Sequence, residues 1–157
     1  MRSALLILGI AFAVAAQGQA PHAMPPGADP GQFKPLPERR DVLSWKVLGQ
    51  VDLVKAKDRY VPQFAPSVAA LDQKEVKVQG FMLPLQPGAL QTHFVLSAMP
   101  QTCAFCLPGG PESLVEVKTK RPVKYTFDPV VVSGRLSVLK DDPRGVYYSI
   151  SDAVQAK

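Results

Sequence analysis

The stretch Pro129-Val-Val-Val-Ser-Gly134-Arg-Leu-Ser-Val-Leu139 is rich in β-branched residues and has a glycine at its centre. β-Branched residues favour strands, and a glycine inside a strand marks a bulge or a sharp bend. An earlier stretch, residues 75–83, alternates polar and apolar residues up to Val78 and then meets Gly80. Small barrels need bends of this kind in order to close. The two stretches therefore predict a strongly bent sheet.

Three shorter stretches complete the predicted sheet: residues 92–97, 113–118 and 146–150. Short strands at close spacing, with turn signals between them, are typical of a small all-β barrel or sandwich. We predict an oligonucleotide/oligosaccharide-binding (OB)-like five-stranded barrel, with an open β-sandwich as the alternative.

Shorter elements are predicted on both sides of these strands. Residues 41–48 predict a short helical turn, capped by Asp41 or Ser44 and stopped by Gly49. Residues 51–54 predict a first strand or a continuation of that turn. Residues 60–66 contain two prolines and predict irregular structure or an edge strand. Residues 152–154 predict a closing turn.

The N-terminus has the pattern of a secretory signal peptide. Arg2 supplies a positive charge, residues 4–16 are apolar, and small residues follow. We predict a signal peptide over residues 1–18, a proline-rich linker over 19–40, and one domain over 41–157. An uncleaved membrane anchor is the alternative. No other apolar run has the length of a transmembrane helix, so the mature chain is expected to be periplasmic and to lack a transmembrane segment.

The composition fits one exported domain. The chain has 157 residues, 46% of them hydrophobic, and a formal net charge of +5. This length and apolar content are enough for one core. The basic residues are interleaved with acidic ones, and nucleic acid is not expected as a partner of an exported protein.

Both cysteines lie in the stretch Cys103-Ala-Phe-Cys106-Leu-Pro-Gly-Gly-Pro111. Two thiolates at this spacing can chelate one soft ion, such as Cu(I) or Zn(II). Met99 and His93 are the candidates for further ligands. The ordinary alternatives are that His93 is an exposed strand histidine and that Met99 fills space at the rim of the barrel.

Two other interpretations of the cysteines stay open. In an oxidising compartment, Cys103 and Cys106 could form a structural disulfide. Thiol-redox chemistry is the main enzymatic alternative, but it prefers a Cys-x-x-Cys motif at a helix N-terminus. The Pro-Gly-Gly-Pro run after Cys106 does not allow a helix there. No hydrolase site, phosphate loop or organic-cofactor motif is present, so we expect a non-enzymatic protein, with the Cys stretch as an ion site or as a clamped recognition loop.

The order of several short motifs resembles an uncharacterised family of small bacterial periplasmic domains. These motifs are Ser44-Trp45-x-x-Leu48, Val78-x-Gly80-Phe81-x-x-Pro84-Leu85, Cys103 before a proline-containing loop, Pro129-Val-Val-Val-x-Gly134-x-Leu136 and Tyr148-x-Ile150. The family pattern has a histidine two residues after its cysteine, where this chain has Phe105 and adds Cys106. The resemblance implies genes beside ABC-type export systems and metal-related genes, and therefore an envelope transporter or a metallochaperone as partner.

Overall fold

The computed structural model describes residues 36–100 and 109–157. The predicted signal peptide, most of the predicted linker, and Cys103 and Cys106 lie outside the described residues. The elements, in chain order, are α1 (Trp45–Leu48), β1 (Val51–Ala56), β2 (Arg59–Phe64), α2 (Pro66–Ala69), β3 (Glu75–Pro84), β4 (Leu90–Ser97), the 3₁₀ turn η1 (Pro111–Ser113), β5 (Leu114–Lys124), β6 (Val130–Val138) and β7 (Tyr148–Ala156).

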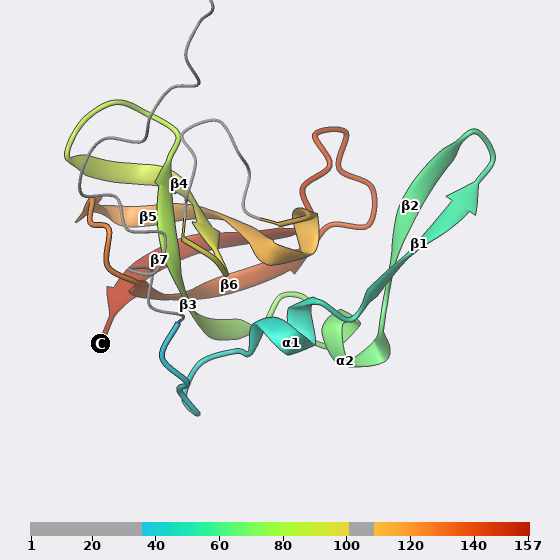
Figure 1. The fold of residues 1–157 in the computed structure, drawn as a ribbon, viewed down its shortest axis with the longest axis horizontal. Coiled ribbons are helices and arrows are strands. Elements are labelled where there is room, and N and C mark those ends of the chain that lie inside the picture. Colours follow the sequence, from blue (N-terminus) through green and yellow to red (C-terminus); the bar gives the residue numbers. More distant parts are fainter. Residues whose placement is uncertain (1–35, 101–108) are drawn as a thin grey trace, which may run out of the picture.

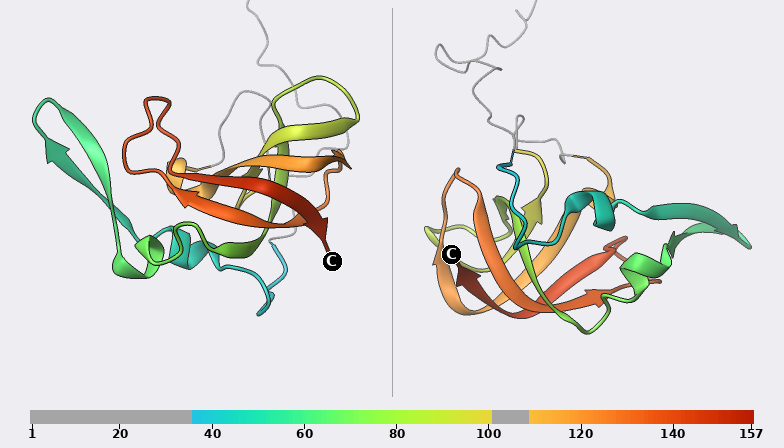
Figure 2. Two further views of the ribbon diagram at one scale, coloured as in Figure 1. Left: turned by 180° about the vertical axis from the view of Figure 1, so that it is seen from behind. Right: turned by 90° about the horizontal axis from the view of Figure 1, so that it is seen from below.

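Strands β3 to β7 form a closed barrel in the order β3-β4-β5-β7-β6. The pair β5–β7 is parallel, whereas the other four pairs are antiparallel. The closed, five-stranded mixed barrel confirms the predicted fold and excludes the open sandwich. Figures 1 and 2 show the strands curving around one core, with the C-terminus at one rim.

The interior of the barrel is filled by the apolar face of every strand. Phe94 and Leu96 of β4 are fully buried, so the intervening side chains of this strand point outward, as expected for alternation. The core also contains Leu48 of α1 and Val68 of α2. Ser44 caps α1 by accepting a hydrogen bond from the Lys46 amide, which confirms the predicted helical turn.

Two glycines, Gly80 and Gly134, lie where neighbouring strands approach closely. They are the two positions at which the sequence predicts bends. A Cβ atom on Gly80 would lie 2.8 Å from the carbonyl oxygen of Ser97, and one on Gly134 would lie 2.7 Å from the carbonyl oxygen of Ser151. Gly134 faces a bulge in β7, because Ser133 pairs with Val154 whereas Arg135 pairs with Ser151. The extra residue bends β7 where it pairs with this part of β6.

The bulge also corrects one prediction. Residues 152–154 do not end the chain in a turn, because β7 continues to Ala156. Asp152 takes a left-handed conformation with φ of 56° and so absorbs the bulge without ending the strand. Strand β5 likewise runs past the predicted end at Lys118 as far as Lys124.

A two-stranded hairpin, β1–β2, projects from the barrel, with α1 and α2 at its base (Figure 1). Pro62 lies in β2, which is an edge strand of this small sheet. Of the two structures predicted for residues 60–66, an edge strand and irregular structure, the edge strand is therefore the one observed. Phe64 anchors the hairpin by packing on Tyr147 and Tyr148 at ring-centroid distances of 5.7 and 5.6 Å. An ion pair of 2.6 Å between Arg59 and Asp141 ties the arm to the β6–β7 connection.

Candidate functional site

The candidate site lies on the outer face of β4 and β5, at the end where these strands are joined by the cysteine-containing connection. A groove of about 270 Å³ runs between the two strands and the β6–β7 connection. Most of its wall is apolar, from Val95, Leu114, Val146 and Tyr147, and the charged pair Glu116 and Arg144 forms the rest, with Gly109 and Pro111 at the end near the cysteines.

Glu116 is the buried charge of this groove, with a side chain only 5% exposed. Its Oε1 accepts from Arg144 Nη1 at 3.0 Å and lies 2.8 Å from His93 Nε2, and its Oε2 accepts from Arg144 Nη2 at 3.2 Å. Burial raises the pKa of Glu116, but the hydrogen bonds from Arg144 and His93 outweigh burial, so the pKa lies below its usual range. Glu116 is therefore ionised at neutral pH.

The ionised carboxylate fixes the proton of His93. An ionised carboxylate only accepts hydrogen bonds, so Nε2 of His93 must carry the proton that it donates to Glu116. The imidazole is half-buried against Glu116, across the sheet from the core residue Phe94. His93 thus faces outward, as the alternation of β4 predicted.

Arg144 joins the β6–β7 connection to this network. Its guanidinium also donates to both carboxylate oxygens of Asp142, at 3.1 and 3.0 Å, and its backbone amide donates to Asp142 Oδ1 at 2.8 Å. The hydrogen bonds from the Arg144 side chain and amide lower the pKa of Asp142. Because the donors and acceptors are matched, the network holds the connection against β5 and leaves Glu116 unsuited to proton transfer at neutral pH.

Met99 lies at the base of the cysteine-containing connection. Ser97 fixes this turn, since its Oγ donates to the Met99 carbonyl at 2.7 Å and accepts from the Met99 amide at 3.1 Å. The Ala98 amide donates to the Ser113 carbonyl at 3.0 Å, which brings the two ends of the connection together. A Cβ atom on Gly109 would lie 3.4 Å from Met99 Cε, so the thioether rests against the far end of the connection.

The two described candidate ligands, His93 and Met99, lie at different places. His93 precedes Ser97 by four residues, which corresponds to about 13 Å along a strand. Met99 is 48% exposed at the end of the barrel, whereas His93 is hydrogen-bonded to Glu116 near the middle of β4. Cys103 and Cys106 lie outside the described residues. Within residues 36–100 and 109–157, no three His, Cys, Asp or Glu side chains are grouped so as to hold a metal ion.

Neither Glu116 nor Arg144 was predicted as a site residue from the sequence. They are 28 residues apart, and the ordinary alternation of β5 explains a glutamate on its outer face. Arg144 lies in the turn after Asp142, where a charged residue carries no distinctive signal. The closed barrel brings them together, because β7 pairs with β5 and so places the β6–β7 connection beside Glu116.

Comparison with known proteins gave one family and one solved structure. The family, described as "Protein of unknown function (DUF3299)", matches residues 24–152. A crystal structure of a DUF3299 family protein from Pseudomonas aeruginosa PAO1 is 28% identical, with a TM-score of 0.47 over 59% of this chain and 68% of that chain. A search of curated proteins gave no match. Among the described residues, no helix has the length and apolar character needed to cross a membrane.

Proposed function

We propose that this chain, which belongs to the DUF3299 family of proteins of unknown function, binds a thiophilic metal ion through Cys103 and Cys106, with Met99 as a third ligand. The observation that supports the proposal most directly is the position of Met99. Its exposed thioether lies at the closed base of the connection that contains both thiols.

The closed base matters because it limits where the thiols can be. Cys103 follows Met99 by four residues, and Cys106 precedes Gly109 by three. A fully extended chain advances by at most about 3.6 Å per residue, so Cys103 lies within about 14 Å of Met99 in Cα distance. The length of the connection therefore allows both thiols to reach the thioether.

The chemistry of the donors selects the class of ion. Two thiolates and a thioether are soft ligands, and this set suits Cu(I) best. Zn(II) also binds thiolates but prefers four nitrogen, sulfur or carboxylate ligands, so it would need water or another side chain in this site. A reversible site with three soft ligands fits a protein that passes an ion on.

His93 has a different role in this proposal. Its Nε2 is hydrogen-bonded to Glu116, and its Cα lies about 13 Å along β4 from Ser97, where the connection begins. The proposal therefore assigns the third ligand to Met99, and His93 to the network that holds the β6–β7 connection in place.

The cellular setting is part of the same proposal. The N-terminal pattern of charge, apolar run and small residues supports export to the periplasm, with the proline-rich stretch as a tether. An exported carrier of Cu(I) or Zn(II) would serve an envelope transporter or a metallochaperone as an accessory protein.

The experiment is an anaerobic purification followed by measurement of bound metal and of free thiols. We expect one Cu(I) per chain after loading, no metal in the Cys103→Ser/Cys106→Ser double variant, and weaker Cu(I) binding in Met99→Leu, which removes sulfur at nearly constant volume. Met82→Leu is the matched control, because it removes a thioether from the buried core of the barrel.

The competing interpretations give other results. A quantitative Cys103–Cys106 disulfide, with no metal bound by either the reduced or the oxidised protein, would overturn the proposal in favour of a structural clamp. Rapid exchange of that disulfide with added thiols, again without metal, would point to redox chemistry. Equal loss of Cu(I) affinity in Met99→Leu and Met82→Leu would remove Met99 from the site.

A further inference from the structure

The barrel end opposite the cysteine-containing connection exposes three large apolar side chains. Leu85 after β3, Leu90 at the start of β4 and Phe127 after β5 are 52%, 64% and 84% exposed. The loops that present them are in contact, since the Tyr125 amide donates to the Ala89 carbonyl at 2.8 Å. Tyr125 also packs on Phe127 with ring centroids 5.3 Å apart. We call Leu85, Leu90 and Phe127 the apolar tip.

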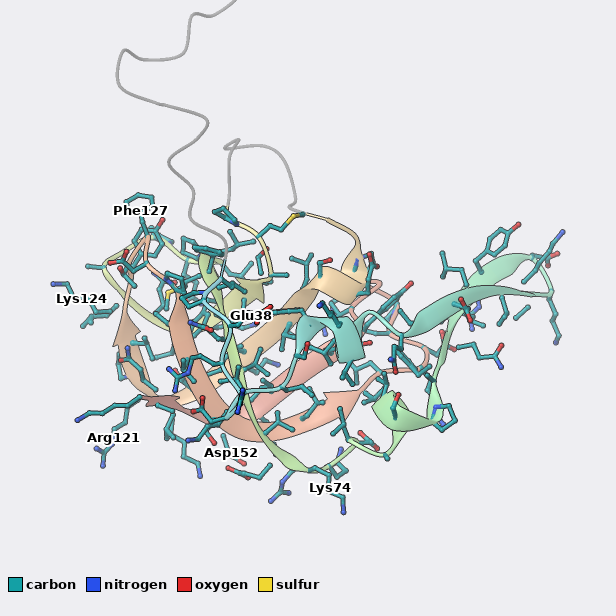
Figure 3. All side chains as sticks on the ribbon, turned by 60° about the horizontal axis from the view of Figure 1, so that its bottom comes forward. Glu38, Lys74, Arg121, Lys124, Phe127 and Asp152 are labelled. Carbon is teal, nitrogen blue, oxygen red and sulfur yellow. The ribbon has the colours of Figure 1, made fainter. Side chains whose placement is uncertain are left out.

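A run of basic residues leads along β5 to this tip. Residues 118–124 contain four cations and no acid, and all four are exposed: Lys118, Lys120, Arg121 and Lys124. Lys124 is the register partner of Leu90, so the run ends directly beside the apolar tip. Figure 3 shows Arg121, Lys124 and Phe127 along the same edge of the barrel.

Few acidic groups oppose this basic run. Asp152 lies 3.9 Å from Lys120, and Asp128 directly follows Phe127. Arg121 and Lys124 take part in no ion pair within residues 36–100 and 109–157. The run therefore keeps a net positive charge of two after both acids are counted against its four cations.

We propose that this end of the barrel docks on the surface of an anionic lipid bilayer. Apolar side chains at loop tips can enter the boundary between headgroups and acyl chains, while lysine and arginine at the rim meet anionic headgroups. Each basic residue near such a surface strengthens binding by about fivefold, the equivalent of about 1 kcal/mol. The apolar tip and the basic run together supply both parts of this interaction.

The composition of the tip favours a bilayer over single-stranded nucleic acid. Proteins that bind single strands stack the bases on aromatic side chains along a basic groove. Two of the three tip residues are leucines, which provide no ring for stacking. Leucine side chains are instead suited to entering an apolar phase.

The inference is independent of the proposed metal site. Strand β4 runs from Leu90 at the tip to Ser97, seven residues or about 23 Å away. Docking through the apolar tip would leave Ser97 and Leu114, the strand ends between which the cysteines lie in the chain, at the far end of the barrel. Failure of metal binding would leave the docking surface untouched, and the reverse also holds.

The test places a tryptophan at the tip of the full-length chain. Phe127→Trp is mixed with vesicles of phosphatidylcholine and phosphatidylglycerol carrying brominated acyl chains, which quench tryptophan in the membrane. Leu53→Trp on the projecting hairpin is the matched control, because Leu53 is also a large exposed apolar residue, at 61% exposure. Subtracting the parent chain removes the signal of Trp45, and residues 1–35 are identical in all three proteins.

We expect quenching of the tryptophan at position 127 and none at position 53, with loss of quenching on vesicles of phosphatidylcholine alone. Arg121→Glu/Lys124→Glu in the Phe127→Trp chain should lower vesicle affinity by at least about 25-fold, since two cations are removed at about fivefold each. Lys55→Glu/Lys57→Glu on the hairpin is the charge control and should change affinity much less.

Three results would overturn the docking surface. Equal quenching at positions 53 and 127 would mean that the chain binds without using this end. No quenching at position 127, in a chain whose circular dichroism matches the parent, would mean that the tip stays in water. A fluorescence change at position 127 with a single-stranded oligonucleotide, but none with anionic vesicles, would assign the surface to nucleic acid.

Discussion

The two ends of the outer face of β4 and β5 use their charges in opposite ways. At the end near the cysteines, Glu116, Arg144 and His93 are matched in one hydrogen-bonded network that fastens the β6–β7 connection. At the other end, Arg121 and Lys124 are exposed beside apolar side chains. The same pair of strands therefore carries a closed, structural end and an open end, where cations and apolar side chains are exposed.

The charge of a residue alone therefore does not reveal its role on this barrel. Glu116 is buried because the β6–β7 connection covers it, and a buried carboxylate needs partners. Lys124 lies where no connection among the described residues covers the sheet, and its side chain is exposed. The loops, rather than the strands, decide which end is structural.

The largest effect is expected from a substitution that disrupts the hydrogen-bonded network at the closed end. Arg144→Ala leaves Glu116 buried with His93 as its remaining side-chain donor, so we expect a loss of about 1–3 kcal/mol in the free energy of unfolding. Chemical denaturation measures this loss. Arg121→Ala at the open end is the control and should stay within about 0.5 kcal/mol of the parent. Equal effects at both ends would remove the distinction between them.

Acid should weaken the closed end selectively. Because the folded pKa of Glu116 lies below its unfolded value, the stability that it contributes is fully present above the unfolded value, about 4.3, and is lost as the pH falls through the lower folded pKa. We expect the unfolding free energy of Glu116→Gln to fall less steeply than that of the parent below about pH 4.3.

The matched control for this pH series is Glu75→Gln, which changes an exposed glutamate on β3. Glu75 lies outside the network of Glu116, so this variant reports the effect of replacing a glutamate elsewhere on the barrel. A Glu116→Gln profile that parallels the parent throughout would show that the carboxylate gains nothing from Arg144 and His93 in the folded protein.

Removal of the imidazole should have a smaller effect. His93→Leu deletes one donor to Glu116 but keeps both hydrogen bonds from Arg144, so we expect a loss of about 0.5–1.5 kcal/mol. Cu(I) loading should be unchanged, since the proposal places His93 outside the metal site. Thr92→Ala, at the exposed neighbouring position, controls for changes to β4. Loss of Cu(I) in His93→Leu with an intact fold would make His93 a ligand.

The smallest effect is expected at the open end. Leu90→Ser should leave the free energy of unfolding within about 0.5 kcal/mol of the parent, because its side chain is 64% exposed. Thermal unfolding with Leu96→Ser as the contrast measures this, since Leu96 is fully buried six residues further along the same strand. A large loss in Leu90→Ser would show that the apolar tip is packed rather than open.

Much of the fold could be predicted from the sequence because the barrel depends on local signals. Strand alternation, turn residues and the central glycines Gly80 and Gly134 lie within single stretches of the chain. The bulge at Asp152 could not be predicted, since it depends on how closely β7 approaches Gly134 of its partner strand β6. The second strand of the hairpin was predicted only as one of two alternatives, because Pro62 is compatible with both an edge strand and irregular structure.

The site was less predictable for the same physical reason. Cys103, Cys106 and Met99 are close in sequence, so local spacing could suggest them as ligands. The network of Glu116, Arg144 and His93 joins two strands, β4 and β5, to the β6–β7 connection, and no local pattern encodes it. His93 could be placed on the outer face from alternation, but its partner could be found only from the closed barrel.

X-ray absorption spectroscopy at the copper edge of the Cu(I)-loaded chain identifies the atoms that bind the metal. The proposed site of Cys103, Cys106 and Met99 predicts a first shell of sulfur at about 2.3 Å, similar to other metal–thiolate bonds, without the scattering pattern of an imidazole ring. The sulfur count should fall by one in Met99→Leu. A first shell of nitrogen and oxygen, or an imidazole signal that disappears in His93→Leu, would contradict it.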